Sequence, residues 1–437
     1  MTDFITHKPS DWHIKNLEKI ASFITKGATP TTYGFEWVEE SCESIPFLRS
    51  ECVTTNGFNR KGMNFISKEA HAVMERSKIK SGDILMTITG NIGRIATLPY
   101  EIPEANINQH IAKISVIDGI SSAYIAQALQ QEHYSRYYER ILTGQAYPQI
   151  SLKQVRETPV LIPSYQEQQK IAEVLSTVDK KIDLIDQKIA ETENLKTGLM
   201  QKLFSEGIGV QDSDGNWQPH SEFQDSPFGK IPKCWSVDSL EQRLDVIKDG
   251  THFSPKSKEG PCKYLTSKNI RFGELDLANL SYISQEEHDR IYKGSPVLHG
   301  DILLTKDGAN TGNAAINTLD EPFSLLSSVA YLRGSEDKVS HGYLLQLLLS
   351  PKGQSMMKSA MAGQAITRLT LKKIAAFVLP FAPIDEQCEI YNILSTVDAK
   401  VQLLKQQKSE TQQLKKGLMQ KLLTGEWRVP LDNPEAA

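Results

Sequence analysis

Two polar loops that contain glycines are the segments best suited to contact a ligand. Residues 89–94 and 306–313 each follow a short apolar segment, 83–88 and 301–305. Neither loop has the GxxxxGK[ST] spacing of a P-loop or the GxGxxG spacing of a dinucleotide site. Small residues allow close approach, and Thr, Asn, Lys and Arg supply hydrogen-bond donors to a phosphate backbone or a base edge. A tight turn between two strands, without any ligand, is the alternative interpretation.

Motifs of catalytic chemistry are missing from the sequence. It lacks the [DNS]PP[YFW] string with which amino-methyltransferases hold the target nitrogen, a glycine-rich S-adenosylmethionine loop, HExxH and GxSxG. The dipeptide Pro-Asp is absent, which weakens the case for a nuclease of the PD…(D/E)xK type. The ten histidines show no metal-ligand spacing. The sequence therefore favours a binding and positioning protein without a metal or cofactor site of its own.

Length and composition set further limits. The 437 residues include 49 Lys+Arg and 53 Asp+Glu, with a pI near 6.2, and they allow about two to four domains. The lack of a run of 18 apolar residues argues against a membrane span. Five scattered cysteines, and a start without signal-peptide features, predict reduced thiols and a cytoplasmic location. A net charge of −4 gives no support by itself to nucleic-acid binding.

The chain contains an internal repeat. With a shift of 219 residues, segment 167–203 aligns with 386–422 without a gap, and 21 of the 37 paired residues are identical. The longest shared strings are LSTVD, starting at 175 and 394, and GLMQKL, starting at 198 and 417. At a shift of 218, GDIL at 82 falls on the same string at 300. A repeat of this length is a domain plus a long helix, because solenoid repeats are far shorter.

The repeated segment predicts a long amphipathic helix in each half. Apolar residues alternate at spacings of three and four, which is the pattern of a coiled-coil seam. The seam residues are Ile171, Leu175, Val178, Ile182, Ile185, Ile189, Thr192, Leu195, Leu199 and Leu203, and then Ile390, Leu394, Val397, Val401, Leu404, Thr411, Leu414, Leu418 and Leu422. Because two matching seams can bury each other, we predict an antiparallel pair related by a pseudo-twofold axis. Packing of each helix on its own globular domain is the alternative.

Three details of the helical segments are irregular or specific. Lys408 stands where the first copy has Ile189, so the two seams are not identical. Gly198 and Gly417 lie inside the pattern and indicate either a local kink or the close approach of another helix. Residues 164–167, Ser-Tyr-Gln-Glu, fit a capping box at the first helix start.

The fold class predicted for the globular parts is α+β. Residues 111–116 and 329–332 are expected as strands, and 124–142 and 343–361 as helices. The predicted organisation is a globular domain at 1–163, a helix at 164–206, a linker at 207–234, a second globular domain at 235–381, a helix at 382–425 and a tail at 426–437 that frays from about 431. Segments 1–163 and 235–382 carry 17 basic and 17 acidic, and 17 basic and 16 acidic, residues. Outside the helices most side chains differ between the two repeats, which suggests two similar scaffolds that recognise different targets.

These motifs together resemble a known family. Two GDIL…G..G domains, each followed by a long helix with LSTVD, and the closing string GLMQKLLTGEWRV resemble the DNA-specificity subunit of type I restriction–modification systems. In that family each globular part is a target recognition domain that reads one half of a bipartite DNA site, and the helices set the distance between the halves. Modification subunits dock on the helices, bind S-adenosylmethionine and methylate adenine, and a restriction subunit can join to translocate and cut DNA.

The resemblance implies partners and contact residues for this chain. The expected partners are double-stranded DNA, two modification subunits and a restriction subunit, while the chain itself is non-catalytic. The residues in the loops that match the family, together with a second surface at 147–149 and 366–368, are Thr87, Thr89, Asn91, Arg94, Tyr147, Gln149, Thr305, Lys306, Asn310, Thr311, Thr367 and Arg368.

Three alternatives stay open at this point. The chain can serve a methyltransferase-only or fused restriction system. It can be a coiled-coil scaffold that joins two protein-binding domains, which predicts no sequence-selective protection of DNA. It can also be an enzyme with an unrecognised nuclease or transferase centre, which predicts activity from this chain alone.

Overall fold

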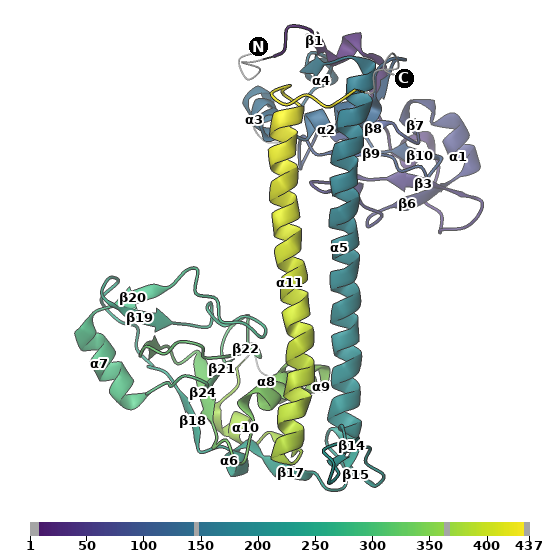
Figure 1. The fold of residues 1–437 in the computed structure, drawn as a ribbon. Coiled ribbons are helices and arrows are strands. Elements are labelled where there is room, and N and C mark those ends of the chain that lie inside the picture. The colour runs from purple at the N-terminus through teal and green to yellow at the C-terminus, as the bar shows by residue number, and fades with distance from the viewer. Residues whose placement is uncertain (1–7, 144–147, 362–367, 432–437) are drawn as a thin grey trace. The chain divides into compact units, whose positions relative to one another are not determined.

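The computed structural model of the protein describes residues 8–143, 148–361 and 368–431 (Figure 1). The chain forms two compact units. Unit 1 consists of Met1–Asp186 and Gln407–Ala437, and unit 2 of Gln187–Gln406. Each unit therefore combines one globular part with a portion of both long helices.

The globular part of unit 1 is built on two four-stranded sheets. The first has the order β2 (Ala21–Lys26), β11 (Ile111–Val116), β8 (Ile84–Thr87), β9 (Ile95–Thr97), with antiparallel neighbours. The second has the order β6 (Asn64–Ser67), β3 (Ser44–Leu48), β10 (Glu104–Ile107), β7 (Lys78–Lys80), in which β10 and β3 are parallel. Two short antiparallel pairs are added, β1 (His13–Asn16) with β12 (Pro159–Ile162) and β4 (Val53–Thr54) with β5 (Gly57–Phe58).

The globular part of unit 2 repeats most of this topology, without strands equivalent to β7 and to the β4–β5 pair among the described residues. Its antiparallel sheet has the order β18 (Val246–Asp249), β24 (Val329–Arg333), β21 (Ile302–Thr305), β22 (Ala314–Ile316). The second sheet has the order β20 (Ser281–Ile283), β19 (Cys262–Leu265), β23 (Ser324–Leu325), with β19 and β23 parallel. The closing pair is β17 (Ser236–Ser239) with β25 (Val378–Phe381). The same connection order in both units confirms the duplication and the α+β class.

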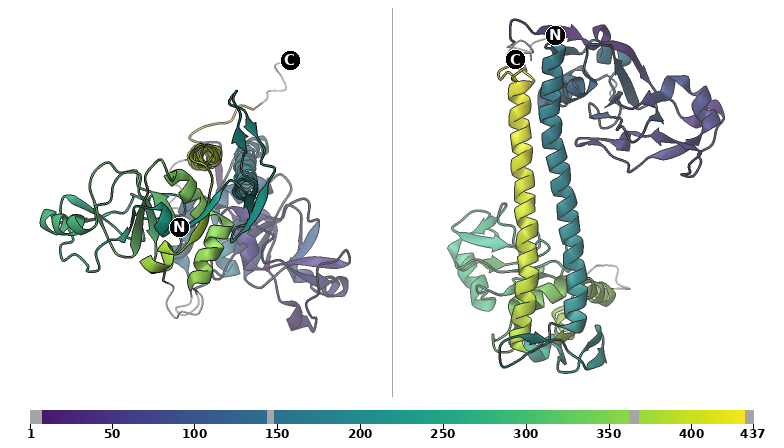
Figure 2. Two further views of the ribbon diagram at one scale, coloured as in Figure 1. Left: turned by 90° about the horizontal axis from the view of Figure 1, so that it is seen from below. Right: turned by 45° about the vertical axis from the view of Figure 1, so that its right-hand side comes forward.

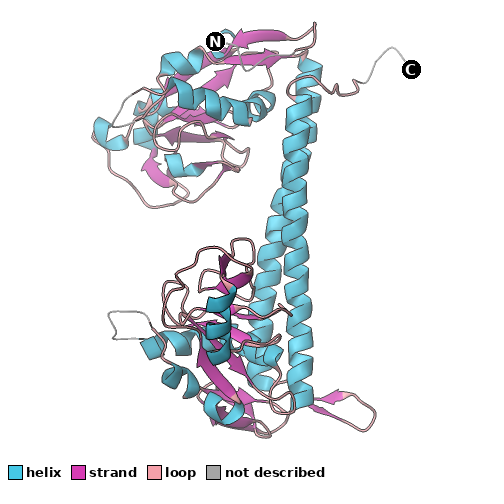
Figure 3. Cartoon of the chain, turned by 90° about the vertical axis from the view of Figure 1, so that its left-hand side faces the viewer, coloured by secondary structure: helices cyan, strands magenta, loops and turns pink. Residues whose placement is uncertain are grey.

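Short helices pack on these sheets, and Figure 3 shows strands and helices mixed within each globular part. Unit 1 has α1 (Lys68–Val73), α2 (Ser122–Leu129), α3 (Glu132–Ile141) and α4 (Leu152–Arg156), and 3-10 turns at Leu17–Lys19, Pro30–Tyr33, Ser50–Cys52 and Glu75–Ser77. Unit 2 has α6 (Leu240–Arg243), α7 (Gln285–Gly294), α8 (His341–Leu349), α9 (Pro351–Met361) and α10 (Leu371–Ala375). Within the described ranges, no helix is both long enough and apolar enough to cross a membrane.

Two helix predictions were wrong in one respect. Each segment expected as a single helix, 124–142 and 343–361, is divided in two. In unit 2 the break falls before Pro351, which disfavours helical backbone at Ser350 and leaves it extended. In unit 1, Gln131 adopts a similar extended conformation without a proline.

The segment 207–234, predicted as a linker, contains two short hairpins. They are β13 (Val210–Gln211) with β14 (Trp217–Gln218), and β15 (Phe223–Ser226) with β16 (Gly229–Pro232). Part of this segment packs on unit 2, since Phe228 and Ile231 belong to its core.

The long helices α5 (Tyr165–Glu206) and α11 (Ile384–Leu422) pair in opposite directions in each unit. In unit 1, Asp179 pairs with Lys415 at 2.7 Å and Asp186 with Lys408 at 2.6 Å. Residue numbers rise along one helix as they fall along the other, which confirms the antiparallel arrangement. Lys408, the polar residue at a seam position, is thereby neutralised.

The same direction holds in unit 2. Lys196 pairs with Asp398 at 2.6 Å, and Glu193 pairs with Lys405 at 3.0 Å. In both views of Figure 2 the segments of α5 and α11 within each unit lie side by side.

The seam follows the predicted pattern at most positions but not at two equivalent leucines. Leu195 and Leu414 are 57% and 55% exposed, so their assignment to the seam was wrong. The next residues, Lys196 and Lys415, are largely covered instead. A helix of 3.6 residues per turn drifts against a strict seven-residue repeat, which moves the covered face by about one residue over several turns.

Each hydrophobic core joins three parts of the chain. In unit 1 the globular core packs on Ile171 and Leu175, at the start of α5, and on Leu422 at the end of α11. In unit 2 it packs on Ile390 and Leu394, at the start of α11, and on Leu203 and Phe204 of α5. Each globular part is therefore covered by the start of its own helix and by the end of the other.

A buried glutamate near the start of each long helix ties these parts together. Glu167 and Glu386 are both 1% exposed. Glu167 accepts hydrogen bonds from Trp12 Nε1 at 3.1 Å and from Arg428 Nε at 2.6 Å. The predicted capping box is only half formed: Ser164 Oγ accepts the Glu167 N–H at 3.3 Å, but the carboxylate turns to Trp12 and Arg428.

Glu386 has equivalent partners in unit 2. It accepts from Trp235 Nε1 at 2.8 Å, from the backbone N–H of Ile208 at 2.7 Å, and contacts His220 Nε2 at 3.0 Å. Trp12 and Trp235, near the start of the two globular parts, thus donate to equivalent glutamates. In each unit, the segment that follows the other long helix also contacts this glutamate. Segment 425–429 contacts Glu167 in unit 1, and segment 207–220 contacts Glu386 in unit 2.

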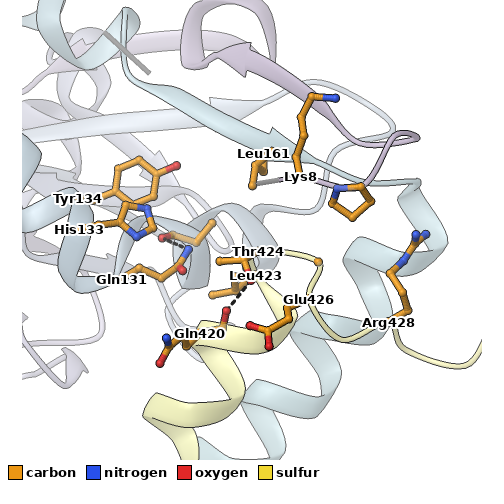
Figure 4. Close-up of a pocket in the computed structure, with 13 residues that line it drawn as sticks. Lys8, Gln131, His133, Tyr134, Leu161, Gln420, Leu423, Thr424, Glu426 and Arg428 are labelled. Atoms are coloured by element: carbon orange, nitrogen blue, oxygen red, sulfur yellow. Dashed lines mark hydrogen bonds between the residues drawn. The ribbon is translucent and has the colours of Figure 1, made fainter. Parts of the chain in front are cut away.

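The described part of the predicted tail is therefore docked. Arg428 also donates to both carboxylate oxygens of Asp11, at 3.1 and 2.7 Å. Its hydrogen bonds to Glu167 and Asp11 raise the pKa of Arg428 and lower that of Asp11. The segment also lines a pocket of unit 1 (Figure 4), with Gln131 and His133 on one side and Thr424 and Arg428 on the other.

The docked arginine gives a first prediction. Arg428→Ala should lower the free energy of unfolding of unit 1 by about 2 kcal/mol, because a buried carboxylate loses a charged donor. Urea unfolding of the full chain measures this value. Arg140→Ala, which removes an exposed arginine of α3, is the control and should leave the transition in place. Equal effects of the two substitutions would contradict a specific role of Arg428.

The helix glycines give a second prediction. Apart from the adjacent residues and the backbone of the same helix, no described atom lies within 4 Å of a Cβ added at Gly198 or Gly417, and both helices continue through them. Close approach of another helix within this chain is therefore absent at these two described positions. Gly198→Ala should raise the free energy of unfolding by up to about 1 kcal/mol, and the reverse change at exposed Ala190 should lower it by as much. A loss of stability in Gly198→Ala would show that the glycine has a packing role.

Candidate nucleic-acid interface

The two surfaces predicted in unit 1 form one continuous face. Thr89, in the loop after β8, is bridged to Gln149, and the backbone N–H of Ile150 donates to the Ile88 carbonyl at 2.9 Å. The segment before α4 therefore lies against the glycine loop. Tyr147, another predicted contact, lies outside the described residues.

Unit 2 brings the equivalent segments together. Asp307, in the loop after β21, is bridged to Arg368, and the N–H of Leu369 donates to the Lys306 carbonyl at 2.8 Å. Thr367 lies outside the described residues. The two loops that the sequence placed about 60 residues apart thus share a surface in each unit.

Three of the predicted contact residues are buried, Thr87, Thr305 and Lys306. Thr87 donates its hydroxyl to the Asn91 carbonyl and accepts from the Arg94 N–H at 3.0 Å, so it holds the glycine loop in shape. Thr305, its equivalent, is also 0% exposed, and its hydroxyl has no hydrogen-bond partner among the described residues. The Thr87 side chain thus supports the loop from the inside of the fold, and neither threonine is exposed at the surface.

The face in unit 1 is polar and largely uncharged. Thr89 Oγ1 shares a hydrogen bond with His110 Nδ1, and His110 Nε2 lies 3.1 Å from Gln109 Nε2. Asn91 and Gln149 are exposed beside them. Arg94 is partly buried. Histidine and amide groups offer both donors and acceptors, which suits the mixed pattern of base edges in a DNA groove.

The face in unit 2 carries balanced charges. Lys306 is only 1% exposed, and its Nζ lies 2.7 Å from Asp307 Oδ2 and 3.4 Å from Asp249 Oδ2. Arg368 Nε lies 3.0 Å from Asp307 Oδ1, while His252 Nε2 lies 3.3 Å from Asp249 Oδ1. Lys306 is therefore a support for the face, because its ammonium group is already held between two carboxylates.

The remaining predicted residues of unit 2 bond to backbone carbonyls, Asn310 outside its own loop and Thr311 within it. Asn310 Nδ2 donates to the Ser267 carbonyl at 3.5 Å, and Thr311 Oγ1 donates to the Gly308 carbonyl at 2.6 Å. Both residues are partly exposed and follow Asp307 in the same loop.

Sequence reasoning missed one loop of this face, residues 251–258. It begins beside the glycine loop, because Ser327 N donates to the Thr251 carbonyl at 2.8 Å and Lys306 N donates to the Ser328 carbonyl at 2.9 Å. Phe253 is 47% exposed in this loop, which also carries exposed basic residues, His252, Lys256 and Lys258.

The loop 251–258 is held in place from α7. Glu287 accepts from the Ser257 hydroxyl and from the N–H groups of Lys256 and Ser257, at 2.8 and 3.0 Å. These hydrogen bonds lower the pKa of Glu287 to about 2. A Cβ at Gly250 would lie 1.9 Å from the Leu325 carbonyl oxygen, so only glycine lets the chain enter the loop here. Gly27 makes the equivalent close approach in unit 1, and this shared pair was the available sequence signal.

A chain of hydrogen bonds connects each globular part to both long helices. Gln127 Nε2 donates to Asp179 Oδ2 at 2.8 Å, and the other oxygen of Asp179 pairs with Lys415. In unit 2, Gln346 donates to Asp398 at 2.7 Å, and Asp398 pairs with Lys196. The aspartate of each LSTVD string thus fixes the globular part and the partner helix at once, a role that the repeat alone did not reveal.

The described residues contain no cluster of three or more His, Cys, Asp or Glu that could hold a metal ion. What the two faces offer is hydrogen bonding from loops held by a rigid frame. That arrangement suits the recognition of another molecule's surface through hydrogen bonds.

Comparisons with known proteins agree with this geometry. The family model of the type I restriction modification DNA specificity domain matches residues 9–194 and 246–413. The chain is 24% identical over 428 residues to the type I restriction enzyme MjaVIII specificity subunit of Methanocaldococcus jannaschii, covering 96% of this chain and 94% of that protein. It is also 24% identical to the MjaIX specificity subunit of the same organism, over 96% and 94% of the two chains.

Two solved structures share the fold. The S subunit of a type I restriction–modification system from M. genitalium matches with a TM-score of 0.56 at 15% identity, over 94% of this chain and 96% of that chain. A chain from a structural study of the assembly and conformational transition of the type I system matches with a TM-score of 0.55 at 15% identity, over 96% and 99%. Because the family model covers most of both repeats, the chain belongs to the type I restriction modification DNA specificity domain family.

Proposed function

We propose that this protein is the DNA sequence-specificity subunit of a type I restriction–modification complex. Each globular part reads one half of an asymmetric bipartite site in double-stranded DNA, and α5 and α11 set the spacing of the halves. The observation that carries the proposal is the pair of faces at the glycine loops. They have the same backbone frame but different side chains, Thr89 and Gln149 in one and Asp307 and Arg368 in the other. A duplicated frame with different side chains is what two unlike half-sites require.

The chemistry of the complex resides in partner subunits in this proposal. Two modification subunits bind S-adenosylmethionine and methylate adenine, and a restriction subunit can join them in the cytoplasm. The nearly equal numbers of acidic and basic residues in each globular part support a need for partners. Neutralisation of phosphates supplies much of the affinity for DNA, so a protein with this charge balance binds DNA weakly alone.

The long helices supply the docking surface for the modification subunits. Leu184 and Leu403 occupy equivalent positions and are 50% and 47% exposed, and Leu195 and Leu414 form a second equivalent pair. Large apolar side chains at two repeated positions of a helix support a partner that binds both repeats in the same way.

Domain exchange tests the modular reading of DNA. Residues 1–163 are replaced by the corresponding segment of a relative with a known target, and methylated adenines are mapped in a host that also carries the modification subunits. One half of the methylated sequence should change, while the other half and the spacing stay as they were. A change in both halves would contradict the proposal, as would methylation without sequence preference by the unaltered complex.

Docking on the helices can be tested separately. Leu195→Glu should weaken binding of the modification subunit at least fivefold, because buried apolar anchors contribute more than about 1 kcal/mol to an interface. Asn194→Glu adds the same charge at the neighbouring exposed position and is the control. The thermal midpoint of the free chain should be unchanged in both, since both side chains are exposed. Equal affinities of the two variants would remove Leu195 from the interface.

A further inference from the structure

Gln149 and Arg368 occupy the same position in the two repeats. A shift of 219 residues relates them, and a shift of 218 relates the residues to which they are bridged, Thr89 and Asp307. The following residues, Ile150 and Leu369, are buried at 1% and 0% exposure. Successive side chains of an extended chain point to opposite sides, so Gln149 and Arg368 face outward from the glycine loop.

Arg368 is oriented before any ligand binds. Its side chain is 51% exposed, and its Nε is held by Asp307 Oδ1 at 3.0 Å. Asp307 is itself fixed by the buried Lys306. Within the described part of the chain no other group bonds to the two terminal nitrogens of Arg368. A guanidinium held at Nε presents those two nitrogens as a fixed fork, which matches O6 and N7 of guanine in the major groove.

Gln149 offers a different pattern on an equally fixed backbone. Its N–H donates to the Thr143 carbonyl at 2.9 Å, and its carbonyl accepts from the Thr143 N–H at 3.1 Å. Its side chain is exposed, and no described residue bonds to the side-chain amide. An amide presents one donor and one acceptor side by side, which matches N7 and N6 of adenine.

The neighbours of the two side chains agree with this division. Thr89, where unit 2 has Asp307, bonds to His110 and supplies no carboxylate to anchor an arginine. In unit 2, the carboxylate of Asp307 beside Arg368 disfavours a phosphate, because two anions would share one cation. A guanine edge is uncharged and meets no such repulsion.

We propose that Gln149 and Arg368 are equivalent base-reading side chains, with Gln149 contacting an adenine in the half-site of the first globular part and Arg368 a guanine in the half-site of the second. The inference rests on the proposed function and names the bases that this position reads. Asp307 and Lys306 act as positioning residues for Arg368.

Methylation of a random-sequence DNA library by the full chain, assembled with its modification subunits, tests the proposal. Arg368→Gln should reduce the preference for guanine at one position of one half-site by about tenfold. The double substitution Thr89→Asp with Gln149→Arg should transfer the arginine–aspartate pair to unit 1. It should change the preference from adenine to guanine at one position of the other half-site. Arg136→Gln, in which an exposed arginine of α3 loses its pairing with Glu132, is the control and should leave the methylated sequence unchanged.

The outcomes distinguish the assignment of bases to Gln149 and Arg368 from the proposed function itself. A uniform loss of methylation in Arg368→Gln, with an unaltered target sequence, would identify a phosphate contact and overturn the inference. An unchanged target in both variants would overturn it as well, while specific methylation by the unaltered complex would leave the proposed function in place. The double variant lies in the other unit, so it tests the position independently if Arg368→Gln assembles poorly.

Discussion

The arrangement of each unit depends on a buried carboxylate near the start of its long helix. A buried charge is stable only when hydrogen-bonded and paired, so Glu167 and Glu386 require donors at fixed places. Each takes one donor from the tryptophan that opens its own globular part, and the others from the segment that follows the partner helix. One side chain thus joins three stretches of sequence that are far apart, and the hydrophobic core closes around it.

This constraint makes each unit a product of both halves of the chain. Unit 1 is completed by Leu422 and Arg428, and unit 2 by Leu203 and Ile208. The Asp179–Lys415 and Asp398–Lys196 pairs add a second point of attachment along the helices. Since each aspartate also accepts from a glutamine of the globular part, a rotation of that part against the helices would break this hydrogen bond to a charged group.

The sequence allowed prediction of the elements that repeat and not of those that differ. Seam periodicity and the 219-residue repeat located α5, α11 and their antiparallel pairing, because these depend on patterns within the sequence. The exposure of Leu195 and Leu414 was missed, since helical drift against the heptad accumulates only in three dimensions. The glycine loops were located, but pairing of Thr89 with Gln149 or of Lys306 with two aspartates is a contact between distant segments, and no spacing encodes it.

In the proposed function, the separation between the buried frame and the exposed face lets one fold recognise two different half-sites. Thr87 and Lys306 are examples of groups that are buried or bonded within the protein and that support the face. Such groups fix the backbone positions from which the exposed side chains project. Gln149 and Arg368 then differ in chemistry at one fixed place. Lys306 is the clearest case. A lysine in a polar loop is readily predicted to contact DNA, but its ammonium group is paired with Asp307 and Asp249. Charge that is neutralised inside the face supports orientation instead of general affinity. In the proposed function, discrimination between bases therefore falls to the few side chains whose polar groups stay unpaired.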